Sequence, residues 1–449
     1  MGKELFGTDG IRGTPGAYPL DDLTLHALGR ALGEHLRWSS TPARVLIGMD
    51  TRESGPHIVE RLAAGLRMMG VEYGFAGVIT TPGVACLVRQ RGFAAGVVVS
   101  ASHNPYSDNG VKLFAKTGMK FPDAAEAGIE KRLLELRDDD VTHRQTKLKA
   151  DPGLDAEYLE WLRARILPGA NLRGMRIALD CANGAASALG PELLRSLGAE
   201  VIALHCAPDG RNINVNCGSL HPEALQKKVA ETGAALGVAF DGDADRAIFI
   251  SASSKLVNGD GVLLACARYL KSAGQLKGGR VVSTTMANLG LEKALAADGL
   301  TLAREPVGDR YVLEGMMRDG ANLGGEQSGH IIFLDDATTG DGLLTALKVA
   351  SLVALQGPLD GLVAGLRVYP QTIINVRVRE KPPLESIPAV AAALAEAERA
   401  LDGSGRVVLR YSGTEGLARV MVEAERDADV ARYSESIAAA IRAAIGATG

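Results

Sequence analysis

Apolar runs typical of buried strands alternate with stretches of helical periodicity along most of the chain. From Val45 the order is the strand V-L-I-G-M-D, a helix over 58–69, the strand V-E-Y-G-F-A, a short helix after Pro82 and the strand G-V-V-V-S. Strands that alternate with helices in this way pair in parallel, because each helix carries the chain back across the sheet. The first block therefore predicts an open α/β sheet.

The same order returns twice. The second block has R-I-A-L-D, a helix over 191–197, E-V-I-A-L-H, a helix over 222–230 and A-A-L-G-V-A-F-D. The third block has a helix over 262–273, V-V-S-T-T, a helix over 291–297, L-T-L-A-R and A-N-L-G-G-E. Each block covers about a hundred residues, an ordinary size for one domain. The pattern predicts three similar α/β domains.

The block after Tyr369 differs from the others. A strand, T-I-I-N-V-R-V, and a long Ala-rich helix precede two strands that flank one loop, R-V-V-L-R and A-R-V-M-V-E. Two strands on either side of one loop pair antiparallel, which is typical of an α+β domain. A charged, turn-rich passage over 138–153 marks a first boundary. We expect α/β domains with mixed or parallel sheets at 1–150, 151–253 and 254–367, and a smaller α+β domain at 368–449.

Composition narrows the class of protein. The 449 residues carry a formal net charge of −4 and no basic tract. The chain therefore lacks the positive charge that proteins use to bind nucleic acids or membrane surfaces. Five scattered cysteines without a C-x-x-C pair argue against a disulfide framework and against a zinc site. No signal-peptide region and no membrane-spanning apolar run is visible. These features are typical of a cytoplasmic metabolic enzyme.

The first block carries an unusual polar loop at a strand end, where open α/β sheets bind ligands. Its sequence is Ser100-Ala101-Ser102-His103-Asn104-Pro105. Asn109-Gly110 is a turn signal, which predicts that the loop folds back beside Lys112. A serine is a nucleophile only where a neighbour accepts its proton or neutralises its charge, a role open to His103 or Lys112. A plain turn with capping Ser and Asn side chains fits this loop equally well.

The second block carries A-F-D-G-D-A-D-R, in which Asp241, Asp243 and Asp245 lie between two apolar strands. Three carboxylates this close repel one another unless a cation intervenes, and oxygen ligands alone favour Mg²⁺ over zinc. An EF-hand does not fit, because Arg246 replaces its sixth-position glycine and Ala252 its bidentate glutamate. A solvated acidic turn is the alternative. With a cation present, Arg246 would balance charge or hold a phosphate.

The third block carries G-G-E-Q-S-G-H. In an extended chain Glu326, Ser328 and His330 would lie on one face, an arrangement suited to hydrogen bonds with sugar hydroxyls. A glycine-rich turn with a satisfied histidine is the alternative. Gly308 and Asp309, in the preceding strand-end turn, are expected beside this loop.

The last block carries R-Y-S-G-T-E-G-L-A-R. Two guanidinium groups, two hydroxyls and exposed backbone N–H groups suit a phosphate group, and a simple hairpin loop is the alternative. The residues concerned are Arg410, Ser412, Gly413, Thr414 and Arg419.

Dinucleotide-binding, P-loop and hydrolase signatures are absent from the sequence. The four loops, in this order and with G-T-D-G-I-R-G at 7–13, instead resemble the α-D-phosphohexomutase family from the first residues to the last block. Five motifs are most similar to those of bacterial members that act on glucosamine phosphates. They are L-F-G-T-D-G-I-R-G, S-A-S-H-N-P, D-G-D-x-D-R, V-G-D-R-Y-V and G-E-Q-S-G-H.

The resemblance implies three similar α/β domains and a smaller α+β fourth around one central cleft. It implies that Ser102 carries a phosphoryl group, as phosphoserine, and that the three aspartates hold one Mg²⁺ against it. Glu326 and Ser328, with Gly308 and Asp309, would bind the sugar. The phosphate far from the reaction would be held by Arg410, Ser412, Gly413, Thr414 and Arg419, and the reacting end by Arg12, His103, Lys112, Arg246 and His330.

The implied reaction interconverts glucosamine 6-phosphate and glucosamine 1-phosphate through a hexosamine 1,6-bisphosphate, which also serves as activator, and so feeds UDP-N-acetylglucosamine and cell-wall synthesis. Lys112 and His330 are both candidates for proton transfer. A phosphomannomutase or phosphoglucomutase with the same machinery is the nearest alternative. A non-catalytic sugar-phosphate-binding protein and a metal-dependent phosphatase are two others. The implied partner is a small-molecule sugar phosphate, and a homodimer is compatible with the resemblance.

The sequence departs from the family pattern in two loops. The family's fourth loop usually reads R-P-S-G-T-E-P, whereas Tyr411 and Gly416 replace both prolines here. Their loss raises the entropy of the empty loop, which predicts weaker phosphate affinity or a more mobile fourth domain. In the metal loop Ala244 stands where glycine is commoner, which should remove access to positive φ without removing a ligand.

Overall fold

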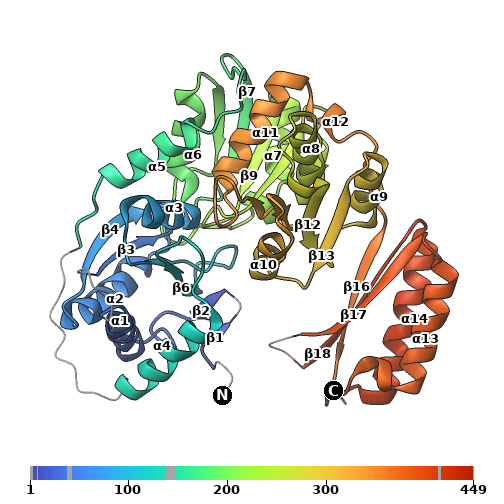
Figure 1. Ribbon diagram of the computed structural model, residues 1–449, viewed down its shortest axis with the longest axis horizontal. Coiled ribbons are helices and arrows are strands. Elements are labelled where there is room, and N and C mark those ends of the chain that lie inside the picture. Colours follow the sequence, from blue (N-terminus) through green and yellow to red (C-terminus); the bar gives the residue numbers. More distant parts are fainter. Residues whose placement is uncertain (1–3, 8, 38–42, 138–147, 413–415, 448–449) are drawn as a thin grey trace. The chain divides into compact units, whose positions relative to one another are not determined.

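The computed structural model describes residues 4–7, 9–37, 43–137, 148–412 and 416–447. The chain divides into two compact units, one of Met1–Thr284 with Glu305–Ala364 and one of Thr285–Arg304 with Gly365–Gly449. The described strands form four sheets, one in each block of the sequence (Figure 1). The predicted fold class, three α/β domains and a smaller C-terminal α+β domain, is confirmed.

The first sheet combines a parallel centre with an antiparallel edge. Its strands are β1 (Phe6–Gly7), β2 (Gly10–Gly13), β3 (Arg44–Met49), β4 (Glu72–Val78), β5 (Ala95–Val99) and β6 (Asn109–Ala115), in the order β1-β2-β6-β5-β3-β4. β3 pairs in parallel with β4 and β5, as the alternating pattern predicts, while β6 runs antiparallel to β5. The serine loop therefore leaves the carboxyl end of a buried strand, β5, and returns through β6.

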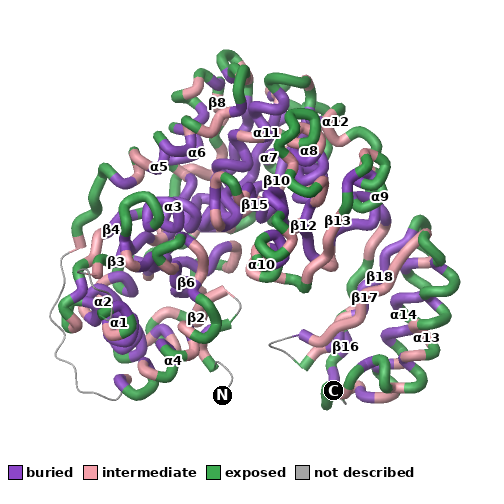
Figure 2. The backbone as a smooth tube through the Cα atoms, in the orientation of Figure 1, coloured by how far each residue is buried: buried purple, intermediate pink, exposed green. Residues whose placement is uncertain are grey.

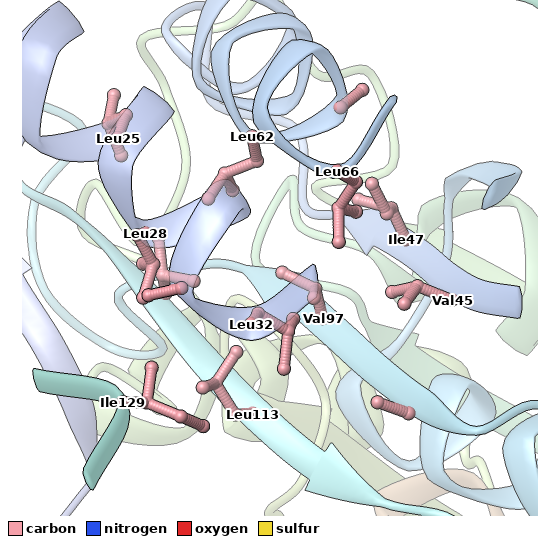
Figure 3. Close-up of a cluster of buried hydrophobic side chains, with 14 of the residues drawn as sticks. Leu25, Leu28, Leu32, Val45, Ile47, Leu62, Leu66, Val97, Leu113 and Ile129 are labelled. Carbon is pink, nitrogen blue, oxygen red and sulfur yellow. The ribbon is translucent and has the colours of Figure 1, made fainter. Parts of the chain in front are cut away.

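Helices cover both faces of this sheet. They are α1 (Asp22–Leu36), α2 (Gly55–Met68), α3 (Thr81–Arg91) and α4 (Asp123–Leu136). Figure 3 shows leucines of α1 and α2 directed toward Val45 and Ile47 of β3 and Val97 of β5. Each fully buried leucine of this kind stabilises the fold by roughly 1.5–3 kcal/mol. The core thereby fixes the strands whose ends carry the polar loops.

The second sheet has the order β11-β10-β9-β7-β8, with β9, β7 and β8 parallel and β10 and β11 antiparallel. β9 (Leu236–Phe240) and β10 (Ala247–Ser251) are buried throughout, and β10 appears purple in Figure 2. The other elements are α5 (Gly153–Arg163), β7 (Arg176–Asp180), α6 (Ala186–Ser196), β8 (Glu200–Leu204), a 3₁₀ turn over Gly218–Leu220, α7 (Glu223–Thr232) and β11 (Leu256–Val257). The loop of three aspartates thus joins two buried strands.

The helix predicted at 191–197 begins earlier, at Ala186, and contains Pro191 in its interior. Proline is commonest at the first helical position, where its missing N–H breaks no hydrogen bond. The apolar and small residues before it, A-S-A-L-G, continue the helix instead. The error therefore concerns the helix boundary and leaves the order of elements unchanged.

In the third sheet β14 (Leu323–Gly325) lies parallel to β12 (Arg280–Thr284) and antiparallel to β15 (Ile331–Phe333). Its helices in the first unit are α8 (Gly259–Ser272), α10 (Asp309–Asp319), α11 (Gly342–Gln356) and α12 (Leu359–Leu362), with a 3₁₀ turn at Lys277–Gly279. α9 (Leu289–Ala297) and β13 (Thr301–Glu305) follow β12 along the chain. The hairpin between β14 and β15 carries the third polar loop.

The second unit contains an antiparallel sheet, as its two loop-linked strands predict. β18 (Leu417–Ala424) lies between β16 (Gln371–Arg377) and β17 (Gly405–Tyr411). The helices are α13 (Pro388–Leu401) and α14 (Asp427–Ile445), with a 3₁₀ turn at Leu384–Ser386. Buried and exposed residues alternate along α14 (Figure 2), and its buried residues join a core with the strands.

The turn predicted at Asn109-Gly110 is wrong. Both residues begin β6, and the chain reverses earlier, where the Asp108 N–H donates to the Pro105 carbonyl oxygen at 3.1 Å. Gly110 is needed for close approach: a Cβ there would lie 2.8 Å from the carbonyl oxygens of Ile11 and Ser100. The serine loop nevertheless folds back beside Lys112 as expected, because Lys112 pairs with Val98 of β5.

Within the described residues, the helices include none long and apolar enough to cross a membrane.

A buried carboxyl group caps α11. Asp341 is 1% exposed, accepts the Leu344 N–H at 2.9 Å and accepts the Tyr158 hydroxyl at 2.9 Å. Burial raises the pKa of this carboxyl to about 6, although both hydrogen bonds act in the opposite direction. Its ionisation therefore costs folding free energy.

The buried Asp341 carboxyl predicts that the folding stability of the protein depends on pH. A folded-state pKa above the unfolded value means that the folded chain binds more protons, so stability falls as pH rises from about 4 to about 6 and stays reduced above that range. Asp341→Asn keeps the cap and removes the charge. Urea denaturation should show the stability of the variant relative to wild type rising by roughly 1 kcal/mol between about pH 5 and pH 7.5.

Asp360→Asn is the control of opposite sign. Hydrogen bonds from Ser253 and Ser251 hold the pKa of Asp360 below its ordinary value despite the opposing effect of burial, so its removal should destabilise the protein at neutral pH. A relative stability of Asp341→Asn that does not change with pH would contradict the assignment.

Candidate active site

The two serines of the first loop have different surroundings. Ser102 lies in the left-handed region, with φ of 53°, and its Oγ donates to Asp241 Oδ2 at 2.6 Å. Ser100 Oγ accepts the Ser102 N–H at 2.9 Å and donates to Asp50 Oδ2 at 2.5 Å. Ser100 therefore shapes the loop, and Ser102 directs its hydroxyl at the carboxylates of the second domain.

A buried ion pair supports the backbone of the serine loop. The side chains of Asp50 and Arg52 are both 0% exposed and bonded to each other. Arg52 Nη2 also donates to the carbonyl oxygens of Ser102 at 3.1 Å and Asn104 at 2.6 Å. The Asn214 amide donates to the same two oxygens at 2.9 and 3.0 Å. Four donor contacts on two carbonyls hold the strained Ser102 backbone in place.

The three aspartates meet the serine loop at close range. Their carboxylate oxygens lie within 4.8 Å of one another, and all three residues are buried. Asp243 Oδ2 accepts the Thr81 hydroxyl at 2.6 Å and the Lys112 ammonium at 2.9 Å. Gly242 permits the approach, because a Cβ there would lie 2.5 Å from the Ser102 carbonyl oxygen. The structure thus brings the predicted serine and the predicted aspartates into one site.

This carboxylate cluster fits a hard divalent cation. Asp243 Oδ1 and Asp245 Oδ1 are buried without a hydrogen-bond partner. Burial, together with the neighbouring charges of Asp245 and Asp243, holds the pKa of Asp241 well above its ordinary value. Buried carboxylate oxygens without donors are costly unless a positive charge reaches them. A cation coordinated by oxygen would satisfy them.

Ala244 contradicts one expectation. The alanine at this position was expected to lose access to positive φ, yet it adopts φ of 55° with its side chain fully buried. The Gly342 N–H donates to its carbonyl oxygen at 2.9 Å. Tertiary contacts therefore impose the left-handed conformation that glycine would adopt more readily, at a cost of about 1–2 kcal/mol.

Lys112 compensates several carboxylates at once. Its Nζ lies 2.9 Å from Asp243, 3.0 Å from Asp9 and 3.6 Å from Asp245. Burial lowers its pKa, but these carboxylates more than offset that effect and hold the pKa well above the ordinary value. Arg12 donates to Asp9 at 2.6 Å and to the Ala101 carbonyl at 3.2 Å. The first motif of the chain is thereby tied to the serine loop.

His103 lies between the serine and an arginine. Its Nδ1 is 3.2 Å from Ser102 Oγ and 3.2 Å from Arg246 Nη1. Burial and the positive charges of Arg246 and Arg12 lower the pKa of His103 to about 4. The ring is therefore neutral near pH 7, and the lone pair of its Nδ1 accepts the Arg246 donor.

A chain of charges connects the first block to the third. Lys120 Nζ contacts Asp9 and Asp309, each at 2.6 Å. His330 lies 3.7 Å from Asp245 and 3.9 Å from Asp309. Burial lowers the pKa of His330, but Asp245 and Asp309 raise it above the ordinary value overall. A cavity of about 170 Å³ is lined by Lys120, Asp309 and His330.

The His330 ring also has a defined acceptor. The Gly340 N–H donates to Nε2 at 2.9 Å, so Nδ1 carries the proton in the neutral ring and faces Asp245. A second proton on Nε2 would break the Gly340 hydrogen bond.

The third loop is a turn and not an extended segment. The Gly329 N–H donates to the Glu326 carbonyl, so side-chain alternation does not place His330 beside the other two residues. Glu326 and Ser328 still meet, through a hydroxyl donation of 3.4 Å, and the Gly308 N–H donates to Glu326 at 3.2 Å. Of the expected set, Glu326, Ser328 and Gly308 form one group and His330 joins the aspartates.

The fourth loop begins in the antiparallel sheet. Arg410 and Arg419 are directly paired across β17 and β18, and both line a cavity of about 270 Å³ on that sheet. Burial and the charge of Arg419 lower the pKa of Arg410. Ser412 is buried, and its N–H donates to the Leu417 carbonyl at 2.8 Å. The predicted phosphate contacts of Gly413 and Thr414 lie outside the described residues.

The two residues that replace the family prolines are both bonded. The Tyr411 hydroxyl donates to the Pro382 carbonyl oxygen at 2.6 Å, and the Gly416 carbonyl accepts the Val378 N–H at 2.9 Å. These bonds anchor both ends of the loop. The expected weakening of phosphate affinity stays a prediction.

Several site residues escaped the sequence analysis. Asp50 and Arg52 follow the first apolar strand, so the rule that ligands bind at strand ends could have found them. Asp9 lies within the motif at 7–13. Lys120 and Asn214 carry no local signal, because their partners lie more than a hundred residues away in the chain.

Comparisons with known proteins agree along the whole chain. The phosphoglucomutase/phosphomannomutase alpha/beta/alpha domains I, II and III match residues 3–139, 156–254 and 258–369, and the C-terminal domain of the same family matches residues 373–440. A phosphoglucosamine mutase of Solibacter usitatus is 53% identical over 447 residues, covering 99% of this chain and 100% of that protein.

Solved structures give the same fold. A phosphoglucomutase/phosphomannomutase family protein of Burkholderia thailandensis has a TM-score of 0.78 at 26% identity, covering 99% of this chain and 98% of that one. An N-acetylphosphoglucosamine mutase of Aspergillus fumigatus, in complex with GlcNAc-6P and magnesium, has a TM-score of 0.65 at 19% identity, covering 98% and 96%.

Proposed function

The chain belongs to the phosphoglucomutase/phosphomannomutase family, and we propose that it interconverts glucosamine 6-phosphate and glucosamine 1-phosphate through a phosphoserine at Ser102. One observation carries the proposal: the Ser102 hydroxyl donates into a buried cluster of three carboxylates, two of which keep oxygens without hydrogen-bond partners. Phosphoryl transfer requires positioning and neutralisation of charge, and this site supplies both.

Asp241, Asp243 and Asp245 would hold the metal ion, and their oxygen-only chemistry favours Mg²⁺. When bound, it would neutralise negative charge on the phosphoryl group. A bound magnesium ion is named for the Aspergillus relative, which supports the same choice here.

In the proposed first step the bond between phosphorus and Ser102 Oγ breaks, and a bond forms to the free hydroxyl of the sugar phosphate. The hydroxyl proton passes to Ser102 Oγ, which is left as a free hydroxyl, and the resulting hexosamine 1,6-bisphosphate turns end for end. In the second step the bond between the other phosphorus and the sugar oxygen breaks, that phosphoryl group bonds to Ser102 Oγ, and the serine proton passes to the released sugar oxygen. Arg12, His103, Lys112, Arg246 and His330 surround the reacting end.

The geometry separates the two candidates for proton transfer. Lys112 has a raised pKa and three carboxylate neighbours, so it keeps its proton and neutralises charge. In the neutral His330 ring, the lone pair of Nε2 already accepts the Gly340 N–H, so that nitrogen moves a proton only if this hydrogen bond opens. His103 Nδ1 is 3.2 Å from Ser102 Oγ, but its lone pair already accepts Arg246 Nη1 at 3.2 Å, so the same condition applies to this ring.

The sugar and its distal phosphate would bind elsewhere on the chain. Glu326 and Ser328 offer a carboxylate and a hydroxyl to sugar hydroxyls, with Gly308 and Asp309 nearby. Arg410 and Arg419 offer two adjacent guanidinium groups to the phosphate. The other phosphate contacts proposed from the sequence are Ser412, Gly413 and Thr414. A hexosamine bisphosphate as activator, a homodimer and a cytoplasmic location stay predictions.

The choice of glucosamine rests on the named relatives. Gln327, the residue beside the sugar-binding pair, donates to Asp260 at 3.1 Å, so its amide is held within the protein. A phosphomannomutase or phosphoglucomutase with the same serine and carboxylates is therefore the second candidate.

A substrate panel tests the proposal. We expect kcat/KM for glucosamine 6-phosphate to exceed that for glucose 6-phosphate and mannose 6-phosphate by at least about tenfold, the discrimination available from one or two polar contacts. Each sugar is assayed with Mg²⁺ and a catalytic amount of its 1,6-bisphosphate. A higher kcat/KM for either neutral sugar would overturn the choice of substrate, and net release of inorganic phosphate would indicate a phosphatase.

A further inference from the structure

A second cluster of metal-ligating side chains lies in the same sheet as the aspartate loop. Asp180 ends β7, His205 follows β8, and Cys217 precedes the 3₁₀ turn at Gly218–Leu220. One ligand atom from each lies within 4.8 Å of the others. The cluster belongs to β7 and β8, whereas the aspartate loop follows β9.

The ligands are held by the fold rather than meeting at a mobile surface. Asp180 and Cys217 are 0% and 1% exposed, and the His205 side chain is 32% exposed. Asp180 Oδ1 accepts the Ala182 N–H at 2.9 Å, which leaves Oδ2 facing His205 Nδ1 at 2.9 Å. His205 itself adopts φ of 48°, a costly conformation for a residue with a side chain. The strained backbone at His205 thus holds the imidazole against the Asp180 carboxylate.

The donor set determines which cation would bind. One thiolate, one imidazole nitrogen and one carboxylate oxygen suit zinc, whereas Mg²⁺ and Ca²⁺ prefer oxygen alone. Three protein ligands leave a fourth, tetrahedral position, which water can fill from the exposed side of His205. We propose that Asp180, His205 and Cys217 form a Zn²⁺ site separate from the aspartate cluster, against the expectation from cysteine spacing, because the fold brings these three distant residues together.

The position of this site suggests its effect. His205 and Cys217 stand at the two ends of the loop 206–216, and this loop contacts the first domain. Asn214 donates to the carbonyl oxygens of Ser102 and Asn104, and the Gly210 carbonyl accepts the Glu53 N–H at 3.0 Å. Joining the ends of a loop lowers its entropy. A cation at its base would steady the donor that holds the serine loop.

Cobalt substitution tests the site on the full-length protein. Metal-free protein is titrated with Co²⁺ in a large excess of Mg²⁺, which occupies the aspartate cluster. We expect a near-ultraviolet thiolate-to-cobalt absorption band that saturates at one cation per chain and is displaced by Zn²⁺. Cys217→Ser should lose the band. Cys266→Ser, the change of another buried cysteine, should retain it.

A second readout needs no cysteine variant. Addition of Zn²⁺ to the Mg²⁺-saturated wild type should slow backbone hydrogen exchange in 206–216 at least about tenfold, and His205→Gln should abolish this protection. The proposal is overturned if the wild type gives no thiolate band, if Cys217→Ser keeps it, or if zinc leaves exchange in 206–216 unchanged. None of these results bears on the substrate panel.

Discussion

Ser102→Ala abolishes turnover of glucosamine 6-phosphate, with kcat reduced by at least about 10⁴-fold, because no oxygen remains to carry the phosphoryl group. The fold should be unaffected, since alanine and serine meet the same restriction at a φ of 53°. Intact mass after incubation with hexosamine 1,6-bisphosphate should show one added phosphoryl group on the wild type and none on the variant.

Variants of two other serines serve as controls for Ser102→Ala. Ser107→Ala changes an exposed residue of the same loop and should keep wild-type kcat. Ser100→Ala removes the hydroxyl that links Asp50 to the Ser102 N–H, so kcat should fall while phosphorylation persists. A Ser102→Ala enzyme within about tenfold of wild type would exclude the phosphoserine mechanism.

Arg52→Met is expected to cost about 3–5 kcal/mol of folding free energy, the usual loss when one partner of a buried ion pair is removed. Asp50 would remain in a site that already raises its pKa by burial, so the loss should shrink at lower pH as that carboxyl takes up a proton. Turnover should also fall, because the Ser102 and Asn104 carbonyls lose a donor. Urea denaturation and kcat measure the two effects.

A double variant separates stability from catalysis. Asp50→Asn with Arg52→Met removes both charges, so most of the folding free energy should return while kcat stays low. Arg211→Met, at an exposed pair with Glu53, should cost no more than about 1 kcal/mol. A double variant that is as unstable as Arg52→Met would show that packing, and not the unpaired charge, governs the loss.

The sequence predicts the parts of this protein that depend on local pattern. Alternating apolar runs gave the order of strands and helices, and three aspartates between two such runs gave the carboxylate cluster. Local reasoning failed where distant contacts decide the conformation. Asn109-Gly110 joins a strand because it pairs with Arg12 and Gly13 of β2, and Ala244 is left-handed because its surroundings require it.

The electrostatic support of the site was beyond the reach of local pattern. Lys120 meets Asp309 across 189 positions, and Asn214 meets Ser102 across 112. No spacing rule relates residues so far apart. The turn at 326–329 shows a related limit, since the predicted common face held only for an extended chain.

The paired arginines of the last sheet repel each other, and a bound anion would relieve this repulsion. Arg410 and Arg419 face each other on adjacent antiparallel strands, and like charges in that position weaken a sheet by roughly 0.2–1 kcal/mol. An anion placed between them turns that repulsion into two attractions. If a phosphate binds there as proposed, part of its affinity would come from relief of this repulsion, which is present in the protein before the ligand arrives.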